Sequence, residues 1–202
     1  MEPVHRKYEL RVARHAATVA EARRMDGRLS NLRLAVFVLA VANVVAAVWV
    51  DFPWSPLLVL VLVFAGLAVL HERAIRRRRQ AEAALAHAER CLRRLDAVWA
   101  GEGVQGEAFA GESHPFARDI DLVGRGSLYE LICEARTTEG QRALFEVLAG
   151  DADADAIRER QEAVRELAPR ADLRAQLAVA AEPAQHVPTK PLLEWANRPG
   201  EP

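Results

Sequence analysis

Two apolar runs, LAVFVLAVANVVAAVWV at residues 34–50 and LLVLVLVFAGLAVL at residues 57–70, decide the fold of this chain. The first run contains one polar residue, Asn43, and the second contains none. A helix needs roughly 20 residues to cross the hydrocarbon core of a bilayer, which is about 30 Å thick. Both runs approach that length when a few flanking residues are added, so the sequence predicts two transmembrane helices.

The predicted membrane hairpin covers residues 32–71, with spans at about 32–50 and 54–71. Pro53 and Pro56 lie in the short segment between the two runs. Proline is tolerated in the first turn of a helix but not in its interior. The two prolines therefore predict a break between the spans and the start of the second span.

Basic and aromatic residues predict how the hairpin is oriented. Trp49 and Trp54 are expected at one membrane interface, because indole rings are favoured there. Arg33 precedes the first apolar run and Arg73 follows the second, each among further arginines, whereas the only charged residue of the turn is Asp51. The positive-inside rule then places both ends of the chain in the cytoplasm. Abundant alanine and arginine suggest a GC-rich bacterial genome, so we expect a multi-pass protein of the inner (cytoplasmic) membrane.

Three other interpretations of the apolar runs remain. A cleaved signal peptide has a short charged leader and no second apolar run, unlike this chain. A buried hairpin in a soluble bundle normally has a polar face, and these runs have none. Asn43 is either a functional polar residue inside the membrane or, as we favour, a hydrogen-bonding residue between helices.

The segments that flank the hairpin are predicted to be cytoplasmic helices. Residues 1–31 predict an amphipathic helix, rich in alanine, arginine and glutamate. Residues 72–99 predict a second helix with a coiled-coil-like seam of Ala81, Leu85, Ala88, Leu92, Leu95 and Trp99. One helix enters the membrane and the other leaves it, so we expect them to pack antiparallel as a stalk. Dimerisation through the seam is the alternative.

The C-terminal half is expected to be a separate all-α module. Residues 100–113 contain four glycines and predict a linker. Residues 114–202 show several helical stretches and no sustained strand alternation. The predicted N-terminal caps are Ser127 with Glu130 as a capping box, Thr138 with Gln141, Asp153 or Asp155, and Asp172.

Part of this module resembles a known family. The matching elements are Asp121-Leu122, Gly126-Ser127-Leu128, Arg136-Thr137-Thr138, Gly140, and Arg160 with Val164 in a later helix. They resemble the start of the core, or lever, domain of the MutS family of DNA mismatch repair ATPases. The arrangement as a whole looks like the N-terminal part of a membrane-bound, MutS-like protein. The resemblance implies the first helices of a partial MutS-like core domain at 114–202, with structural roles for the matching residues.

The chain departs from that family in the sequence pattern that binds ATP. An ATP site needs the P-loop pattern Gly-x-x-x-x-Gly-Lys-Ser/Thr, and neither Lys7 nor Lys190 lies in such a pattern. We therefore expect no catalytic, cofactor or metal site and no enzyme activity in this chain. The resemblance implies ATP with magnesium, DNA binding and an ATPase domain for the full-length family only. We expect the chain to be an N-terminal fragment or a natural truncation.

Other candidate sites have simpler explanations. His114, Asp119 and Asp121 could form a metal or acid–base site, but no second histidine is nearby, so helix entry and loop hydrogen bonding explain them better. Ser127 lacks the flanking pattern of a nucleophile elbow, so helix capping explains it better. Cys91 and Cys133 match no metal spacing and are expected to be free thiols. The arginines after residue 136 alternate with glutamates and predict a solvated mixed-charge face.

The sequence thus favours a membrane-anchored, MutS-like protein in which this chain supplies the anchor and lever helices. The alternative is a non-enzymatic membrane scaffold that docks a protein partner through its helices. A membrane-tethered nucleic-acid binder is a third interpretation, which the net charge of −1 disfavours. The lipid bilayer is the expected partner, and a homodimer and DNA are further candidates.

Overall fold

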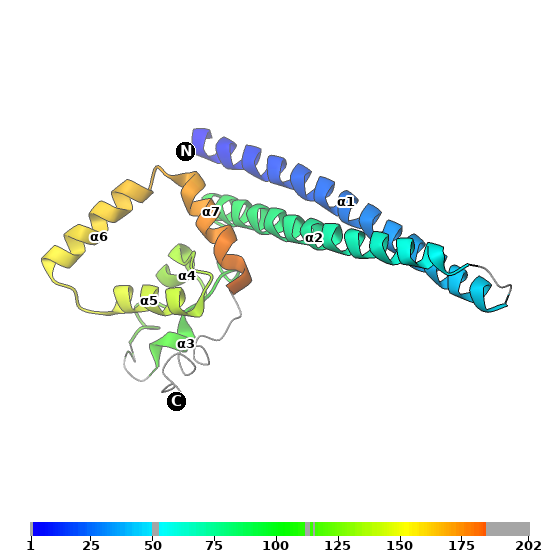
Figure 1. Cartoon of the computed structure of the whole chain (residues 1–202). Coiled ribbons are helices and arrows are strands. Elements are labelled where there is room, and N and C mark those ends of the chain that lie inside the picture. The colour runs from blue at the N-terminus through cyan, green and yellow to red at the C-terminus, as the bar shows by residue number, and fades with distance from the viewer. Residues whose placement is uncertain (1, 50–52, 112–113, 115, 185–202) are drawn as a thin grey trace, which may run out of the picture. The chain divides into compact units, whose positions relative to one another are not determined.

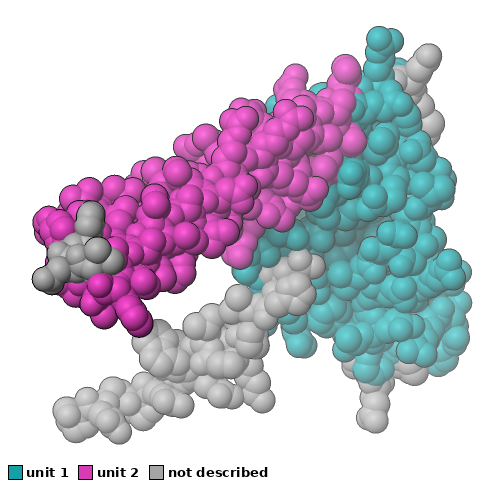
Figure 2. All heavy atoms as spheres, turned by 90° about the vertical axis from the view of Figure 1, so that its right-hand side faces the viewer, with its two compact units in different colours: residues 1–9, 86–202 teal, residues 10–85 magenta. Residues whose placement is uncertain are grey.

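The computed structural model describes residues 2–49, 53–111, 114 and 116–184. Within these ranges all regular elements are helices, which confirms the predicted all-α class (Figure 1). The chain divides into two compact units, one of residues 10–85 and the other of residues 1–9 with 86–202 (Figure 2). We refer to them as the hairpin unit and the helical module.

Two long helices carry the predicted membrane spans. Helix α1 extends over Glu2–Trp49 and α2 over Ser55–Leu95. Each contains a window that is long and apolar enough to cross a membrane. Neither Gly27 nor Ser30 interrupts α1, because this helix contains no proline after Pro3 and both residues are tolerated in a helix at modest cost. The predicted cytoplasmic helix and first span are therefore one continuous helix.

Ion pairs join α1 to α2 within the hairpin unit. The Arg23 guanidinium donates two hydrogen bonds to Glu82 Oε1, at 2.8 and 3.0 Å. Arg78 donates to Asp26 Oδ2 at 2.9 Å and to Glu82 Oε1 at 3.1 Å. The bond from Arg23 is the main reason that the pKa of Glu82 lies below its usual value. These bonds connect the helix before the first apolar run to the helix after the second, as the predicted antiparallel stalk requires.

The end of α2 corrects the predicted helix over 72–99. The helix ends at Leu95, and Ala97 adopts a left-handed conformation with φ of 58°. Val98 N donates to Arg93 O at 3.0 Å and Ala97 N donates to Arg94 O at 3.2 Å. This pair of bonds is the Schellman motif, which ends helices most often at glycine. Sequence reasoning missed this ending because an alanine occupies the left-handed position, and Trp99 consequently lies beyond the seam.

Shorter helices make up the helical module. They are α3 (Glu107–Ala110), α4 (Leu128–Ile132), α5 (Thr138–Ala149), α6 (Ala154–Leu167), α7 (Ala171–Ala181) and the 3₁₀ helix η1 (Glu182–Ala184). Asp153 caps α6 by accepting a hydrogen bond from Ala156 N at 2.7 Å, so the first of the two predicted caps is correct. Asp172 is not a cap, because α7 begins at Ala171 and the residue before it makes no side-chain cap bond.

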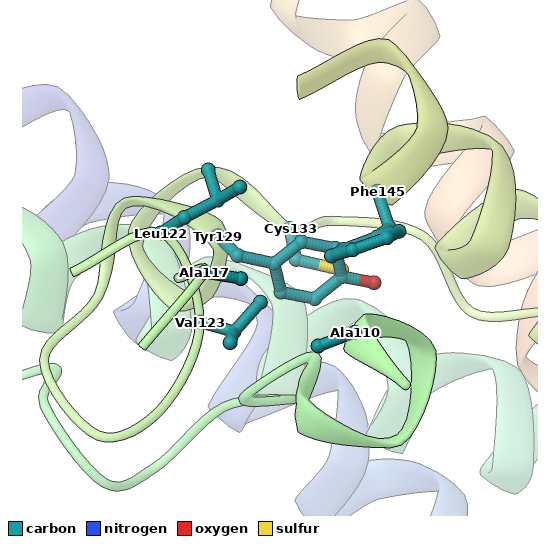
Figure 3. Packing of buried hydrophobic residues seen from close by; sticks show 7 residues of the cluster. All are labelled: Ala110, Ala117, Leu122, Val123, Tyr129, Cys133 and Phe145. Atoms are coloured by element: carbon teal, nitrogen blue, oxygen red, sulfur yellow. The ribbon is translucent and has the colours of Figure 1, made fainter. Parts of the chain in front are cut away.

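Tyr129 lies at the centre of the module's core. Its side chain is fully buried and its hydroxyl donates a hydrogen bond to Gln141 O at 2.8 Å. Around the ring lie Ala110, Ala117, Leu122, Val123, Cys133 and Phe145 (Figure 3). Val104 and Phe109 also pack against this cluster. The predicted linker 100–113 is therefore corrected, because its described residues contribute α3 and several core contacts instead of a free tether.

Gly106 is the position of the former linker with the least space. Its φ is +74°, and an added Cβ would lie 2.7 Å from Tyr129 Cδ1. Gly111 also has a positive φ, +45°, but an added Cβ there would meet nothing within 4 Å. We expect Gly106→Ala to destabilise the module by about 2–4 kcal/mol, and Gly111→Ala by only about 1–2 kcal/mol. Thermal unfolding of the detergent-solubilised chain measures both, and equal losses would contradict the packing around Tyr129.

Candidate functional site

Most of the apolar side chains in the two runs lie on the surface of the hairpin unit. Only 17% of the apolar window in α1 and 11% of that in α2 is buried. The rings of Phe37 and Phe64 have centroids 6.5 Å apart, and Val36 and Leu67 are buried, whereas most other large side chains of the two runs are exposed. The core helix of a soluble bundle would be mostly buried. The exposed apolar surface on both helices is therefore what a lipid-facing pair presents.

The predicted membrane-interface residues lie near the ends of these surfaces. Trp49 is the last residue of α1 and is 83% exposed, and Trp54, just before α2, is 55% exposed. The Arg33 guanidinium lies 5.1 Å from the centroid of the Phe64 ring, a cation–π arrangement. Arg73 is exposed on α2. Asn43 is buried, but its Oδ1 accepts no hydrogen bond from the described residues, so the favoured interhelical bond to that atom is not formed.

The residues of the family-like motif form the turns before α4 and α5. Ser127 Oγ accepts from Glu130 N at 3.2 Å and caps α4. Thr137 Oγ1 accepts from Gly140 N at 3.2 Å and caps α5. The predicted cap at Thr138 is wrong by one residue, since Thr138 is already the first helical residue. Only Thr138 has a polar residue three positions later, Gln141, whereas Thr137 has Gly140 there, so the capping-box spacing selected the wrong threonine.

Glu130 holds the motif together in a way that the capping-box prediction missed. Its side chain is buried, and it accepts hydrogen bonds from the backbone N–H groups of Gly101, Gly103 and Gly126 at 2.7, 2.9 and 2.7 Å. Burial would raise the pKa of this carboxyl, but the three N–H groups outweigh it and the pKa lies below its usual value. A capping box would instead direct Glu130 to the N–H of Ser127, which donates to Gly124 O.

The other motif residues do not converge on a single site. Asp121 is exposed, has φ of 54°, and its carbonyl accepts from Leu128 N at 3.0 Å. Leu128 is 47% exposed at the start of α4. Arg160 and Val164 lie on α6, which has no buried residue. The motif therefore organises local turns and leaves α6 uncovered.

A cleft in the helical module brings several polar and charged side chains close together. Its volume is about 740 Å³, and residues of α1, α2, α4, α7 and the segment after α4 line it. The polar side chains in its wall are those of Tyr8, His87, Cys91, Arg94, Glu134, Thr137, Arg136 and Arg174. A volume of this size is within the range of small-molecule sites.

Three side chains of the cleft form a compact cluster. His87 Nε2 lies 3.7 Å from Cys91 Sγ, and His87 Nδ1 lies 3.5 Å from Glu134 Oε2. His87 and Cys91 are one turn apart on α2 and so share a helix face. Arg94 also pairs with Glu134, and Arg136 Nη2 lies 3.6 Å from Glu134 Oε2.

Positive charge exceeds negative charge around this cluster. Desolvation and the neighbouring charge of Arg136 lower the pKa of Arg90 to about 10. Desolvation likewise lowers the pKa of Arg94. Burial alone would raise the pKa of the Cys91 thiol, but His87, Arg94 and Tyr8 together lower it below the usual value. An environment of this kind stabilises an anion.

His87, Cys91 and Glu134 offer ligand atoms within 4.8 Å of one another, so a metal ion must be considered. Thiolate, imidazole and carboxylate are suitable zinc ligands. However, the guanidinium groups of Arg94 and Arg136 already form ion pairs with the Glu134 carboxylate. A divalent cation roughly 6 Å from one guanidinium is opposed by about 5 kcal/mol at an effective dielectric constant near 20. The charge around the cluster therefore fits a thiolate or a bound anion better than a cation.

Sequence reasoning treated the members of this cluster separately. Both cysteines are free, as predicted, but Cys133 is buried in the core whereas Cys91 lines the cleft. The spacing His87-x-x-x-Cys91 was the available signal, because residues four apart on a helix are neighbours. His114, considered with two aspartates, instead packs edge-on against Phe145 with ring centroids 5.6 Å apart.

Comparison of the chain with protein-family models, curated proteins and solved structures finds no match that assigns a family or a structural relative.

Proposed function

We propose that this chain is a membrane anchor that holds a helical module at the cytoplasmic face of a bacterial inner membrane. The observation that carries the proposal is the exposure of the apolar windows of α1 and α2, of which only 17% and 11% is buried. In water, so large a contiguous apolar surface is unfavourable, whereas in lipid it is the expected exterior. The arginines before the first span and after the second favour cytoplasmic termini.

The finer part of the proposal is that the module acts as a MutS-like lever. The support is the motif resemblance together with the two capped turns at Ser127 and Thr137, which fix where α4 and α5 begin. Rigid, well-capped helices transmit displacement better than loops do. No P-loop pattern is present in the 202 residues, so the chain itself is proposed to be non-enzymatic.

A second candidate function is a scaffold that docks a protein partner through α6. Ile157 and Val164 lie on one face of this helix and are 44% and 64% exposed. Together with Arg160, Gln161 and Arg165 they line a shallow groove of about 360 Å³. An uncovered apolar row at helical spacing is the feature by which amphipathic helices bind partners.

Flotation of the purified full chain with phospholipid vesicles tests the anchor. We expect the protein to move with the vesicles and to stay with them after an alkaline wash. Recovery of a monodisperse soluble chain without detergent would contradict the anchor.

The lever and scaffold proposals differ in what the reconstituted chain binds. The lever proposal expects no ATP turnover and, at most, weak binding of duplex DNA that falls steeply with salt. ATP hydrolysis by the chain would contradict it. The scaffold proposal expects that Val164→Asp abolishes the capture of a specific protein, with Arg158→Gln on the same helix as the control.

A further inference from the structure

Cys91 differs from the other cysteine in access and surroundings. Cys133 is 7% exposed and belongs to the apolar core around Tyr129. Cys91 is partly exposed and lies in the wall of the 740 Å³ cleft. The Cys91 thiol is therefore accessible to reagents that enter the cleft, whereas the Cys133 thiol in the core is not.

The groups that face Cys91 come from four segments. His87, Arg90 and Arg94 share α2 with it, Tyr8 comes from α1, Glu134 and Arg136 from the segment after α4, and Arg174 from α7. Two acidic residues lie near this group: Glu134, which is paired with Arg94 and Arg136, and Glu182, whose Oε2 lies 3.9 Å from Arg136 Nε. The remaining positive charge favours the thiolate of Cys91 and also attracts anions into the cleft.

We propose that Cys91 is a reactive thiol that forms a mixed disulfide with a small, carboxylate-bearing disulfide bound in the cleft. The Cys91 thiolate attacks one sulfur of the reagent. A bond forms between Cys91 Sγ and that sulfur, the reagent's own S–S bond breaks, and its electron pair leaves with the second sulfur as a thiolate. Cys91 is thereby oxidised and the released half of the reagent is reduced, so no further oxidant is needed.

The surrounding residues have separate roles in this reaction. His87, 3.7 Å from Sγ, accepts the thiol proton and can return it to the leaving thiolate. Glu134 Oε2 lies 3.5 Å from the other imidazole nitrogen, Nδ1, where its charge favours the protonated ring. Arg174 is exposed in the cleft wall and donates from Nη2 to Ala168 O at 3.1 Å, and its other N–H groups are placed to pair with a carboxylate of the reagent. This modification would add a bulky anion between α2 and α7, independently of whether the chain anchors to a membrane.

The test uses the full chain in detergent with Cys133→Ala, so that Cys91 is the only thiol. Glutathione disulfide is the anionic probe and hydroxyethyl disulfide the uncharged one, and mass spectrometry follows the adduct between pH 5 and 9. We expect the folded chain to react with glutathione disulfide at pH 7 at least about threefold faster than the same chain unfolded in urea. When a thiol pKa falls by one unit, the thiolate fraction at a pH below the pKa rises about tenfold, while the nucleophilicity of the thiolate falls about threefold. The net rate therefore rises about threefold.

Three variants separate the proposed roles. We expect His87→Gln to move the midpoint of the pH–rate profile upward for both probes. Arg174→Gln should slow the reaction of glutathione disulfide severalfold and leave that of hydroxyethyl disulfide unchanged. Arg93→Gln, on the same helix as Cys91 but outside the cleft wall, is the control and should change the reaction of neither probe. Circular dichroism of each variant checks that the helices are retained.

Two results would overturn the proposal. One is equal reaction of the folded and unfolded chains with an unchanged midpoint in His87→Gln. The other is complete protection of Cys91 by one equivalent of zinc, which would make the cluster a metal site.

Discussion

The double substitution Val41→Arg and Leu62→Arg is expected to prevent stable membrane insertion. Both residues lie near the middle of an apolar run and point outward, with 47% and 64% exposure. An arginine at the centre of a span costs about 2.5–3.5 kcal/mol on insertion scales, so two cost about 6 kcal/mol. Immunoblots of alkaline-washed membranes should show the protein lost from the membrane fraction.

Leu10→Arg is the matched control for this experiment. Leu10 is 63% exposed on α1, like Leu62 on α2, but it lies outside both apolar runs. We expect this variant to remain in the membrane fraction. Retention of the double variant, or equal loss of the control, would mean that lipid does not surround the two runs.

Replacing Glu130 by alanine is expected to open the helical module. The substitution removes the acceptor of three backbone N–H groups, those of Gly101, Gly103 and Gly126. A hydrogen bond to a charged group contributes about 1.5–3 kcal/mol, but the three glycines are exposed and water can replace part of each bond, so the module should lose about 3 kcal/mol. Hydrogen exchange of these three amides measures the loss directly. Glu102→Ala, an exposed change between two of the glycines, should leave their protection unchanged.

Glu130 also makes the module sensitive to acid. Its pKa is lowered in the folded state, so its contribution is complete above the unfolded value of about 4.3. The contribution is lost as the pH falls through the folded pKa, because the protonated carboxyl can no longer accept all three bonds. We expect increased exchange of the three amides in that acid range in the wild type. The same acid transition in Glu130→Gln would show that another group is responsible.

Local patterns predicted the parts of the fold that depend on neighbouring residues. The apolar runs predicted the two long helices, and the caps at Ser127 and Asp153 follow from side chains three residues from their partners. The Arg23–Glu82 and Arg78–Asp26 bonds agree with an antiparallel stalk, which the short turn between the runs required.

Contacts between distant residues were beyond the reach of the sequence. Glu130 binds glycines 27 and 29 residues away, and glycine-rich segments are usually linkers, so 100–113 was predicted as one. The end of α2 depends on an alanine in a left-handed conformation, which intrinsic preference disfavours. The cleft around Cys91 exists because α7 and the segment after α4 meet α2, and no local spacing predicts that meeting.

The most direct test of the membrane anchor is labelling of single cysteines in intact cells. Ser55→Cys lies at the start of α2 between the two apolar runs, and Glu21→Cys lies in the stalk; both are introduced with Cys91→Ser and Cys133→Ala. A membrane-impermeant maleimide is expected to label Ser55→Cys in spheroplasts and Glu21→Cys only after permeabilisation. Protection of Ser55→Cys until the cells are lysed, or equal labelling of both positions before lysis, would contradict a hairpin that crosses the membrane from the cytoplasm.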